Sequence, residues 1–314
     1  MPKSKYKLTI LTIDVEKYLE QQYYGILIYS YFASMIKLGI FGDQTIHPQL
    51  VKQLKKLAGI ELAGAYFYGN SEVPVGLNEL SSPNELMDIS DAILLLSDKS
   101  ISIDLIRQIL RKSKHVYLKA IPNFQIREIK ELIDLEKEAG IATFIYNPFN
   151  YIPYFDPFSR KYEKPFLINL RTSFEGETIK ASHEMLLLVT ALSRVTQSNL
   201  KKLDVFGLSE PTDRLIISLR IEFDNGCVIN LTISQEKLPG YCEIFEPKGR
   251  TKFEFKAPLY ILYPHLNQEY TAISNFIGLI SNQDVKTNSF DNLLSGVQIL
   301  HEIREHLRFN EIAF

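Results

Sequence analysis

The chain has 314 residues, of which 46% are hydrophobic and 23% charged, and its formal net charge is -2. These values are typical of a globular protein and exclude a disordered or fibrous one, and the length predicts two compact domains. A nearly neutral chain has no long-range field that would attract nucleic acid or an anionic membrane, so we expect neither as a partner.

Residues 1–34 are expected to be an N-terminal extension outside the main fold. Their apolar run, at 23–33, is too short to span a bilayer, and acidic residues precede it where an export signal carries positive charge. Two cysteines, Cys227 and Cys242, are too few for a disulfide framework. Together these features predict a cytoplasmic protein.

From Met35 onward, apolar runs of strand length alternate with helical patterns. This alternation is typical of βαβ units around a parallel sheet. The expected strands cover residues 36–41, 60–68, 91–97, 115–118 and 142–146. The expected helices cover residues 47–58, 103–112 and 126–139. Residues 35–150 are therefore predicted to form an α/β domain with a Rossmann-type parallel sheet.

A second domain is predicted from residue 151 to residue 314. Residues 147–165 are rich in Pro and aromatic side chains and have no period, which indicates a passage between domains. Beyond them, Asn225-Gly226 indicates a hairpin turn between two apolar runs. The expected strands cover residues 166–174, 215–223, 227–233, 243–245 and 251–255, and the expected helices 182–195 and 290–307. The pattern predicts an α+β domain with a large, mainly antiparallel open sheet.

Several strings, taken in chain order, resemble the Gfo/Idh/MocA family of nicotinamide-dependent sugar and polyol oxidoreductases. They lie at residues 36–42, 90–97, 114–116, 223–226 and 246–250. The resemblance implies a Rossmann domain that binds NAD or NADP, followed by an open-sheet domain that commonly forms the oligomer interface. It also implies a small, sugar-like substrate.

The glycine-rich turn after the first strand departs from the family pattern. A dinucleotide turn reads G-x-G-x-x-G, because the second glycine admits the pyrophosphate and the third lets the helix approach the strand. This chain has Gly42, Asp43, Gln44, Thr45 and Ile46, followed by a histidine. Only the first glycine remains, and Asp43 adds a negative charge near the expected phosphates. The resemblance still assigns these five residues to the cofactor site.

Two other strand ends are implied to lie at the cofactor. The second strand of a dinucleotide-binding domain usually ends in an acidic residue that holds the ribose. Here Phe67 stands near that end. Its aromatic ring could stack on an adenine, or it could simply be buried where the strand ends. The resemblance also places Ser97 and Asp98, which follow the third strand, at the cofactor.

The catalytic positions implied by the resemblance are only partly kept. The family carries a lysine at the nicotinamide, but Ala120 or Ile121 stands at that position here, and Lys119 is the nearest amine. In the second domain, the family has an Asp and a His four residues apart. Ile179 replaces the Asp, and His183 keeps the histidine, which is a common general base.

Two function classes follow from these departures. The first is an NAD(P)-dependent sugar or polyol oxidoreductase with degenerate motifs, in which Lys119 and His183 are the candidate catalytic residues. The second is a non-catalytic binding or scaffolding subunit, which forms a homo-oligomer through the second sheet or pairs with an active relative. The remaining histidines show no metal-ligand spacing, so no metal site is expected.

Overall fold

A computed structural model describes most of the chain after residue 34. The described residues are 35–43, 46–68, 74, 76–97, 101–122, 124–151, 165–173, 178–196, 198–209, 215–234, 239–255, 265–281 and 289–309. The predicted extension, together with Gln44, Thr45 and Asp98, lies outside them. The described residues form two compact units: the first comprises those up to Asn147 together with 265–291, and the second comprises the rest.

The first unit contains a parallel five-stranded sheet, as the alternating pattern predicts. Its strands are β1 (Ile36–Gly42), β2 (Ile60–Phe67), β3 (Ala92–Leu95), β4 (His115–Leu118) and β5 (Thr143–Ile145). Their order is β2-β1-β3-β4-β5, so the chain leaves β1 toward one side and returns on the other side at β3. Open α/β sheets bind ligands at such a switch point, beyond the carboxyl ends of the strands.

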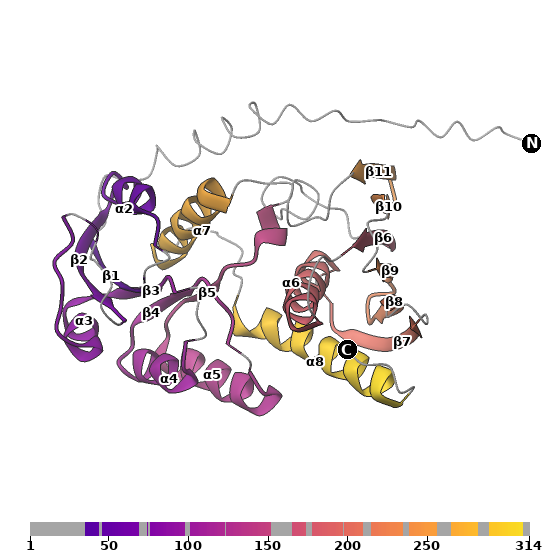
Figure 1. Ribbon diagram of the computed structural model, residues 1–314, viewed down its shortest axis with the longest axis horizontal. Helices are drawn as coiled ribbons and strands as arrows, with labels where there is room; N and C mark the ends of the chain where they lie inside the picture. Colours follow the sequence, from indigo (N-terminus) through magenta and orange to yellow (C-terminus); the bar gives the residue numbers. More distant parts are fainter. Residues whose placement is uncertain are drawn as a thin grey trace, which may run out of the picture. The chain divides into compact units, whose positions relative to one another are not determined.

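Helices cover both faces of this sheet. They are α2 (Pro48–Leu54), α3 (Pro83–Ile89), α4 (Ile103–Arg111), α5 (Ile126–Ala139) and α7 (His265–Ile280). Figure 1 shows α2 and α7 on one face and α3, α4 and α5 on the other. The rings of Tyr117 on β4 and Phe276 on α7 lie 5.9 Å apart, and Phe144 on β5 stacks on Tyr117. Helix α7 thus belongs to the core of the first unit although it follows the strands of the second in sequence.

His115, at the start of β4, is held as a neutral imidazole. Its Nδ1 accepts a hydrogen bond from the backbone N–H of Ala142 at 2.9 Å, which a proton on that nitrogen would abolish. Burial also lowers the pKa of His115 below its ordinary value of 6.5, because the charged ring loses hydration.

This arrangement predicts an acid-sensitive contribution to stability. A histidine whose pKa is lower in the folded chain binds more protons when unfolded, so the free energy of unfolding falls as the pH drops below 6.5. A His115→Asn variant keeps an acceptor and does not titrate. We expect the wild-type protein to lose stability relative to this variant on acidification, in urea unfolding curves. If the difference in free energy of unfolding between the two proteins does not change with pH, His115 is not a buried neutral histidine of lowered pKa.

The second unit contains a mainly antiparallel sheet, as predicted, but with six strands where five were expected, since no strand was predicted over residues 200–209. Its strands are β6 (Leu167–Ser173), β7 (Leu200–Ser209), β8 (Leu215–Phe223), β9 (Val228–Ser234), β10 (Gly240–Glu246) and β11 (Gly249–Phe255). The order is β11-β10-β6-β9-β8-β7, and only the β6–β9 pair is parallel. The predicted hairpin turn is present, since Gly226 has a φ of 84° and the Asn225 side chain accepts a hydrogen bond from Cys227 N.

The second unit also contains η1 (Pro148–Tyr151), α6 (Thr178–Thr196) and α8 (Phe290–Phe309), the last of which begins at the boundary of the two units. Helices α6 and α8 approach closely at Gly296, where an added Cβ would lie 2.0 Å from the hydroxyl of Thr190. Along the strands, buried residues such as Ile168 and Leu170 alternate with more exposed ones such as Asn169 and Arg171. One face of the sheet therefore contributes to the core, and we call the opposite face the outer face.

No helix in the part of the chain that the structure describes is long and apolar enough to cross a membrane.

Candidate dinucleotide site

The turn after β1 is covered by its own chain. Gly42 ends β1, and a Cβ added there would lie 2.0 Å from Cδ1 of Ile46. The Ile46 side chain is 6% exposed, so it packs directly over the glycine. In a dinucleotide turn, the absence of side chains leaves this region open to the pyrophosphate. Here an apolar side chain occupies it.

A buried carboxylate lies at the switch point. The hydroxyl of Ser97, just after β3, donates a hydrogen bond to Oδ2 of Asp43 at 2.5 Å, and both residues are buried. This distance is typical of a hydrogen bond from a hydroxyl to an ionised carboxylate. The two predicted site residues are thus brought together, but they engage each other and place negative charge where phosphates would be expected.

The start of α2 offers few donors to an anion. Pro48, at the first helical position, has no N–H. The backbone N–H of Gln49 already donates a hydrogen bond to Nδ1 of His47, at 3.2 Å. The helix is seven residues long. These three features weaken the helix terminus that usually receives the pyrophosphate.

The end of β2 carries two aromatic residues, Phe67 and Tyr68, that differ in exposure. Phe67 is 6% exposed and packs near Gly42, whereas Tyr68 is 63% exposed. The Tyr68 ring lies 5.4 Å from that of Phe41 and 6.1 Å from that of Tyr66, measured between ring centroids. The exposed Tyr68 ring therefore lies on a small aromatic cluster at the end of β2.

Lys119 is held by a carboxylate from α7. Its Nζ lies 3.4 Å from Oε2 of Glu269, and the two side chains are 19% and 9% exposed. The backbone N–H of Lys119 continues the sheet by donating to the carbonyl of Leu95. The amine is therefore part of a largely buried ion pair at the carboxyl end of β4. No sequence signal pointed to Glu269, which lies 150 residues away.

His183 lies on α6, in the second unit. The helix begins at Thr178, earlier than predicted, so His183 is in its second turn. The side chain is exposed, yet partial desolvation lowers the pKa of the ring, which keeps it neutral near pH 7. A neutral imidazole can accept a proton. The candidate catalytic residues Lys119 and His183 thus belong to different units.

A dinucleotide bound in the usual way does not fit these residues. Its pyrophosphate would meet the Ile46 side chain and the Asp43 carboxylate, and it would find a helix start without its usual donors. Within the described ranges, no group of three or more His, Cys, Asp and Glu residues could hold a metal ion.

The fold has counterparts among solved structures. No family model matches the chain, and no curated protein matches it in sequence. UDP-N-acetylglucosamine 3-dehydrogenase GnnA from Acidithiobacillus ferrooxidans is 13% identical, with a TM-score of 0.65 over 86% of this chain and 97% of its own. The dehydrogenase MviM from Clostridium difficile is 17% identical, with a TM-score of 0.66 over 86% and 99%. A dehydrogenase from Chromobacterium violaceum is 14% identical, with a TM-score of 0.63 over 88% and 96%.

These likenesses extend over both units and nearly the full length of each solved chain. Identities this low show the fold alone. The fold of this chain is that of the Gfo/Idh/MocA-type dehydrogenases, and the resemblance seen in its sequence is confirmed at that level.

Proposed function

We propose that this protein is a homologue of NAD(P)-dependent sugar and polyol oxidoreductases with degenerate cofactor and catalytic motifs, and that it works as a non-catalytic binding or scaffolding subunit. The observation that carries the proposal is the Asp43–Ser97 hydrogen bond at the switch point. It commits a buried carboxylate to the region that must accept two phosphate charges, while Ile46 covers the remaining glycine. NAD or NADP is then bound weakly or not at all.

An activity assay tests the loss of catalysis. We expect no reduction of NAD or NADP above the rate without protein when the purified chain is given UDP-N-acetylglucosamine, the substrate in the name of a dehydrogenase with this fold. A panel of free sugars and polyols extends the assay to the wider substrate class. Turnover with any of them that scales with protein concentration would contradict the proposal.

Assembly through the second sheet is the other part of the proposal. Phe166 and Phe206 are 52% and 64% exposed on this unit, and a partner that covered them would bury apolar surface. The protein would form a homo-oligomer through the outer face, or would pair through that face with an active relative. Its proposed location is the cytoplasm. Light scattering coupled to gel filtration gives the mass that decides between a monomer and an assembly.

A second candidate function is a retained oxidoreductase that acts on a small sugar-like substrate. The Lys119–Glu269 ion pair favours it, because the pair fixes an amine at the carboxyl end of β4, beside the strand that carries Ser97 at its end. In this candidate, His183 accepts the proton of a substrate hydroxyl.

His183→Ala separates the two candidates. If the protein is non-catalytic, we expect only a small change in stability, within about 1 kcal/mol, because the side chain is exposed. If dehydrogenase activity exists and His183 is its general base, the rate falls about 10²- to 10⁴-fold while the thermal unfolding midpoint stays the same. His183→Gln, which keeps a polar side chain of similar size, is the matched control for packing.

A further inference from the structure

The strand directions of the second sheet are symmetric about its centre. Its six strands divide at the β6–β9 pair into two halves of three, and this central pair is parallel. The other neighbouring pairs are antiparallel. A half-turn about a line along the strands, between β6 and β9, therefore exchanges β9 with β6, β8 with β10 and β7 with β11 without reversing any strand. When this line lies just above the outer face, the half-turn brings the outer face of a copy against the original.

Strand register arranges the side chains of the outer face in rows that cross all six strands. Residues directly opposite each other in neighbouring strands share a face of the sheet. The row at the middle of the strands consists, from β7 to β11, of Asp204, Arg220, Asn230, Asn169, Glu243 and Lys252. Along this row, a negative and a positive charge are followed by two neutral amides, and then by a negative and a positive charge again.

This row is complementary to its own copy. Two sheets that pack face to face keep their strands within about 30° of each other, so a two-fold axis in the interface runs either along the strands or across them. The axis along the strands places Arg220 opposite Glu243 of the second copy. It also places Asp204 opposite Lys252. An axis across the strands, through the same row, places each charge opposite the same charge. Like charges that face each other oppose binding, so the row favours the axis along the strands.

The charges of the row are oriented by ion pairs within the chain. Asp204, Arg220, Glu243 and Lys252 pair with Lys202, Glu222, Arg250 and Glu254, respectively. The Arg220 side chain is 52% exposed and donates to Glu222 through Nε, and a guanidinium has further N–H donors at its terminal nitrogens. Glu243 is partly exposed, and an ionised carboxylate accepts about four hydrogen bonds. Both groups can therefore keep their own partners and still pair across an interface.

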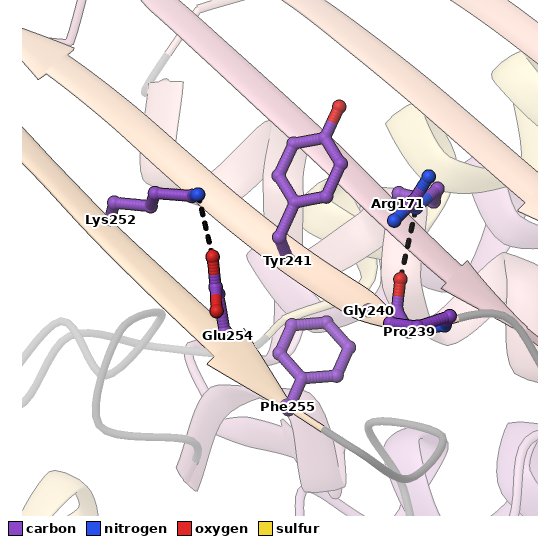
Figure 2. Close-up of a pocket in the computed structure, with 7 residues that line it drawn as sticks. All are labelled: Arg171, Pro239, Gly240, Tyr241, Lys252, Glu254 and Phe255. Carbon is purple, nitrogen blue, oxygen red and sulfur yellow. Dashed lines mark hydrogen bonds and ion pairs between the residues drawn. The ribbon is translucent and has the colours of Figure 1, made fainter.

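The same half-turn sets an exposed phenylalanine over a pocket. The next row of the outer face consists, from β7 to β11, of Phe206, Ser218, Thr232, Arg171, Tyr241 and Glu254. Phe206 is 64% exposed, the largest fraction among the large apolar side chains that the structure describes. At the other end of the row, a pocket of about 710 Å³ opens at Tyr241 and Glu254 (Figure 2). Because the half-turn exchanges β7 with β11, Phe206 of each copy lies over the pocket of the other.

We propose that the outer face binds a second copy of this chain about an axis along the strands, with β8 of each copy against β10 of the other and β7 against β11. The inference rests on the assembly proposed above, and it names the partner and its orientation. Val228 on β9 and Leu167 on β6 lie opposite each other beside the axis, so they meet their copies in an apolar centre. Six strands about 4.8 Å apart, with a rise of about 3.3 Å per residue, give a face of roughly 700 Å², close to the about 800 Å² per partner that a stable interface buries.

Sedimentation equilibrium of the full chain gives the dissociation constant of the dimer. We expect a mass of two chains that falls to one chain on dilution. A chain that stays monomeric up to about 100 μM, where even a dimer of micromolar affinity is formed, overturns this inference. That outcome leaves the proposed pairing with an active relative and the proposed loss of catalysis untouched.

Charge reversal tests the orientation. Arg220→Glu and Glu243→Arg should each weaken dimerisation about 100-fold or more, because each puts two like-charge contacts into a symmetric dimer. An equimolar mixture of the two variants should dimerise again, since both contacts of the mixed dimer then join opposite charges. This recovery also shows that both variants are folded. Arg304→Glu, at an exposed position of α8 in the same unit, is the control and should dimerise like the wild type.

The outcomes of charge reversal separate this inference from the proposed assembly. If Arg220→Glu dimerises as tightly as the wild type, the dimer uses another surface, and both the inference and the assembly through the outer face fail. If Arg220→Glu is monomeric and Glu243→Arg does not restore the dimer, the outer face is used in another orientation, and only the inference fails.

Phe206→Ala tests the same orientation without changing a charge. It should weaken dimerisation about tenfold or more, because two exposed rings lose their contacts with the pockets that face them. Tyr68→Ala is the matched control, since it removes a ring that is 63% exposed on the first unit, and it should leave the affinity unchanged. Equal dissociation constants of the Phe206→Ala and Tyr68→Ala dimers overturn the inference.

Discussion

A variant that combines Asp43→Ala, Gln44→Gly and His47→Gly is expected to bind NADH about 100-fold more tightly than the unaltered protein. A like charge brought against a phosphate costs several kcal/mol, and about 3 kcal/mol corresponds to that factor. The two glycines restore the second and third positions of the dinucleotide turn. Fluorescence or calorimetric titration with NADH measures the gain.

A matched control shows whether the gain is local. Asp91→Ala removes the same charge at the opposite edge of the sheet, where Asp91 directly precedes β3 and accepts a hydrogen bond from the backbone N–H of Lys37 near the start of β1. It should leave NADH affinity unchanged. Asp43→Ala also removes the acceptor of the Ser97 hydroxyl, so thermal unfolding must show that the variant is folded. A folded triple variant with no gain in affinity would show that the turn is not the obstacle.

Lys119→Met is expected to lower the free energy of unfolding by about 3 kcal/mol, because removing one partner of a largely buried ion pair leaves the other charge poorly compensated. Glu269 is the partner, and its side chain is 9% exposed. The double variant Lys119→Met/Glu269→Leu should recover most of the loss, since apolar side chains of similar volume can replace such a pair. Urea unfolding of the two variants measures both effects.

The same pair of variants bears on the role of Lys119. If Lys119 has a structural role, the single variant loses stability, the double variant recovers it, and neither variant changes the affinity for a ligand. If the single variant is as stable as wild type, the ion pair contributes little, and a role of Lys119 in binding a substrate becomes the better explanation. Lys119→Arg, which keeps the charge, is the control for the loss of the ion pair.

Most strands of the two sheets, though not β7, could be predicted because their signals are local. Five apolar runs that alternate with helical patterns predict β1 to β5, and Asn225-Gly226 predicts the turn between β8 and β9. Helix α3 is short and was missed, although the Ser82 hydroxyl accepts a hydrogen bond from Glu85 N at its start and the Glu85 carboxylate accepts one from Ser81 N. Helix α7 was also missed, and its place in the first unit could not be inferred from its position in the chain.

The site could be predicted only in part. The ends of β1 and β3 were expected at the cofactor, and the structure brings Asp43 and Ser97, 54 residues apart in sequence, into contact with each other. Their mutual hydrogen bond depends on strand order and on side-chain direction, which no local pattern encodes. The Lys119–Glu269 pair depends on the packing of α7 against the first sheet and was likewise inaccessible from the sequence.

Calorimetric titration of the unaltered protein with NAD, NADH, NADP and NADPH tests the central claim most directly. A turn covered by Ile46 and carrying the Asp43 carboxylate predicts no saturable binding of any of the four at micromolar concentrations, with heats no larger than those of dilution. Saturable binding of any of them with a submicromolar dissociation constant would contradict the account, because it would mean that the pyrophosphate is accommodated despite these side chains.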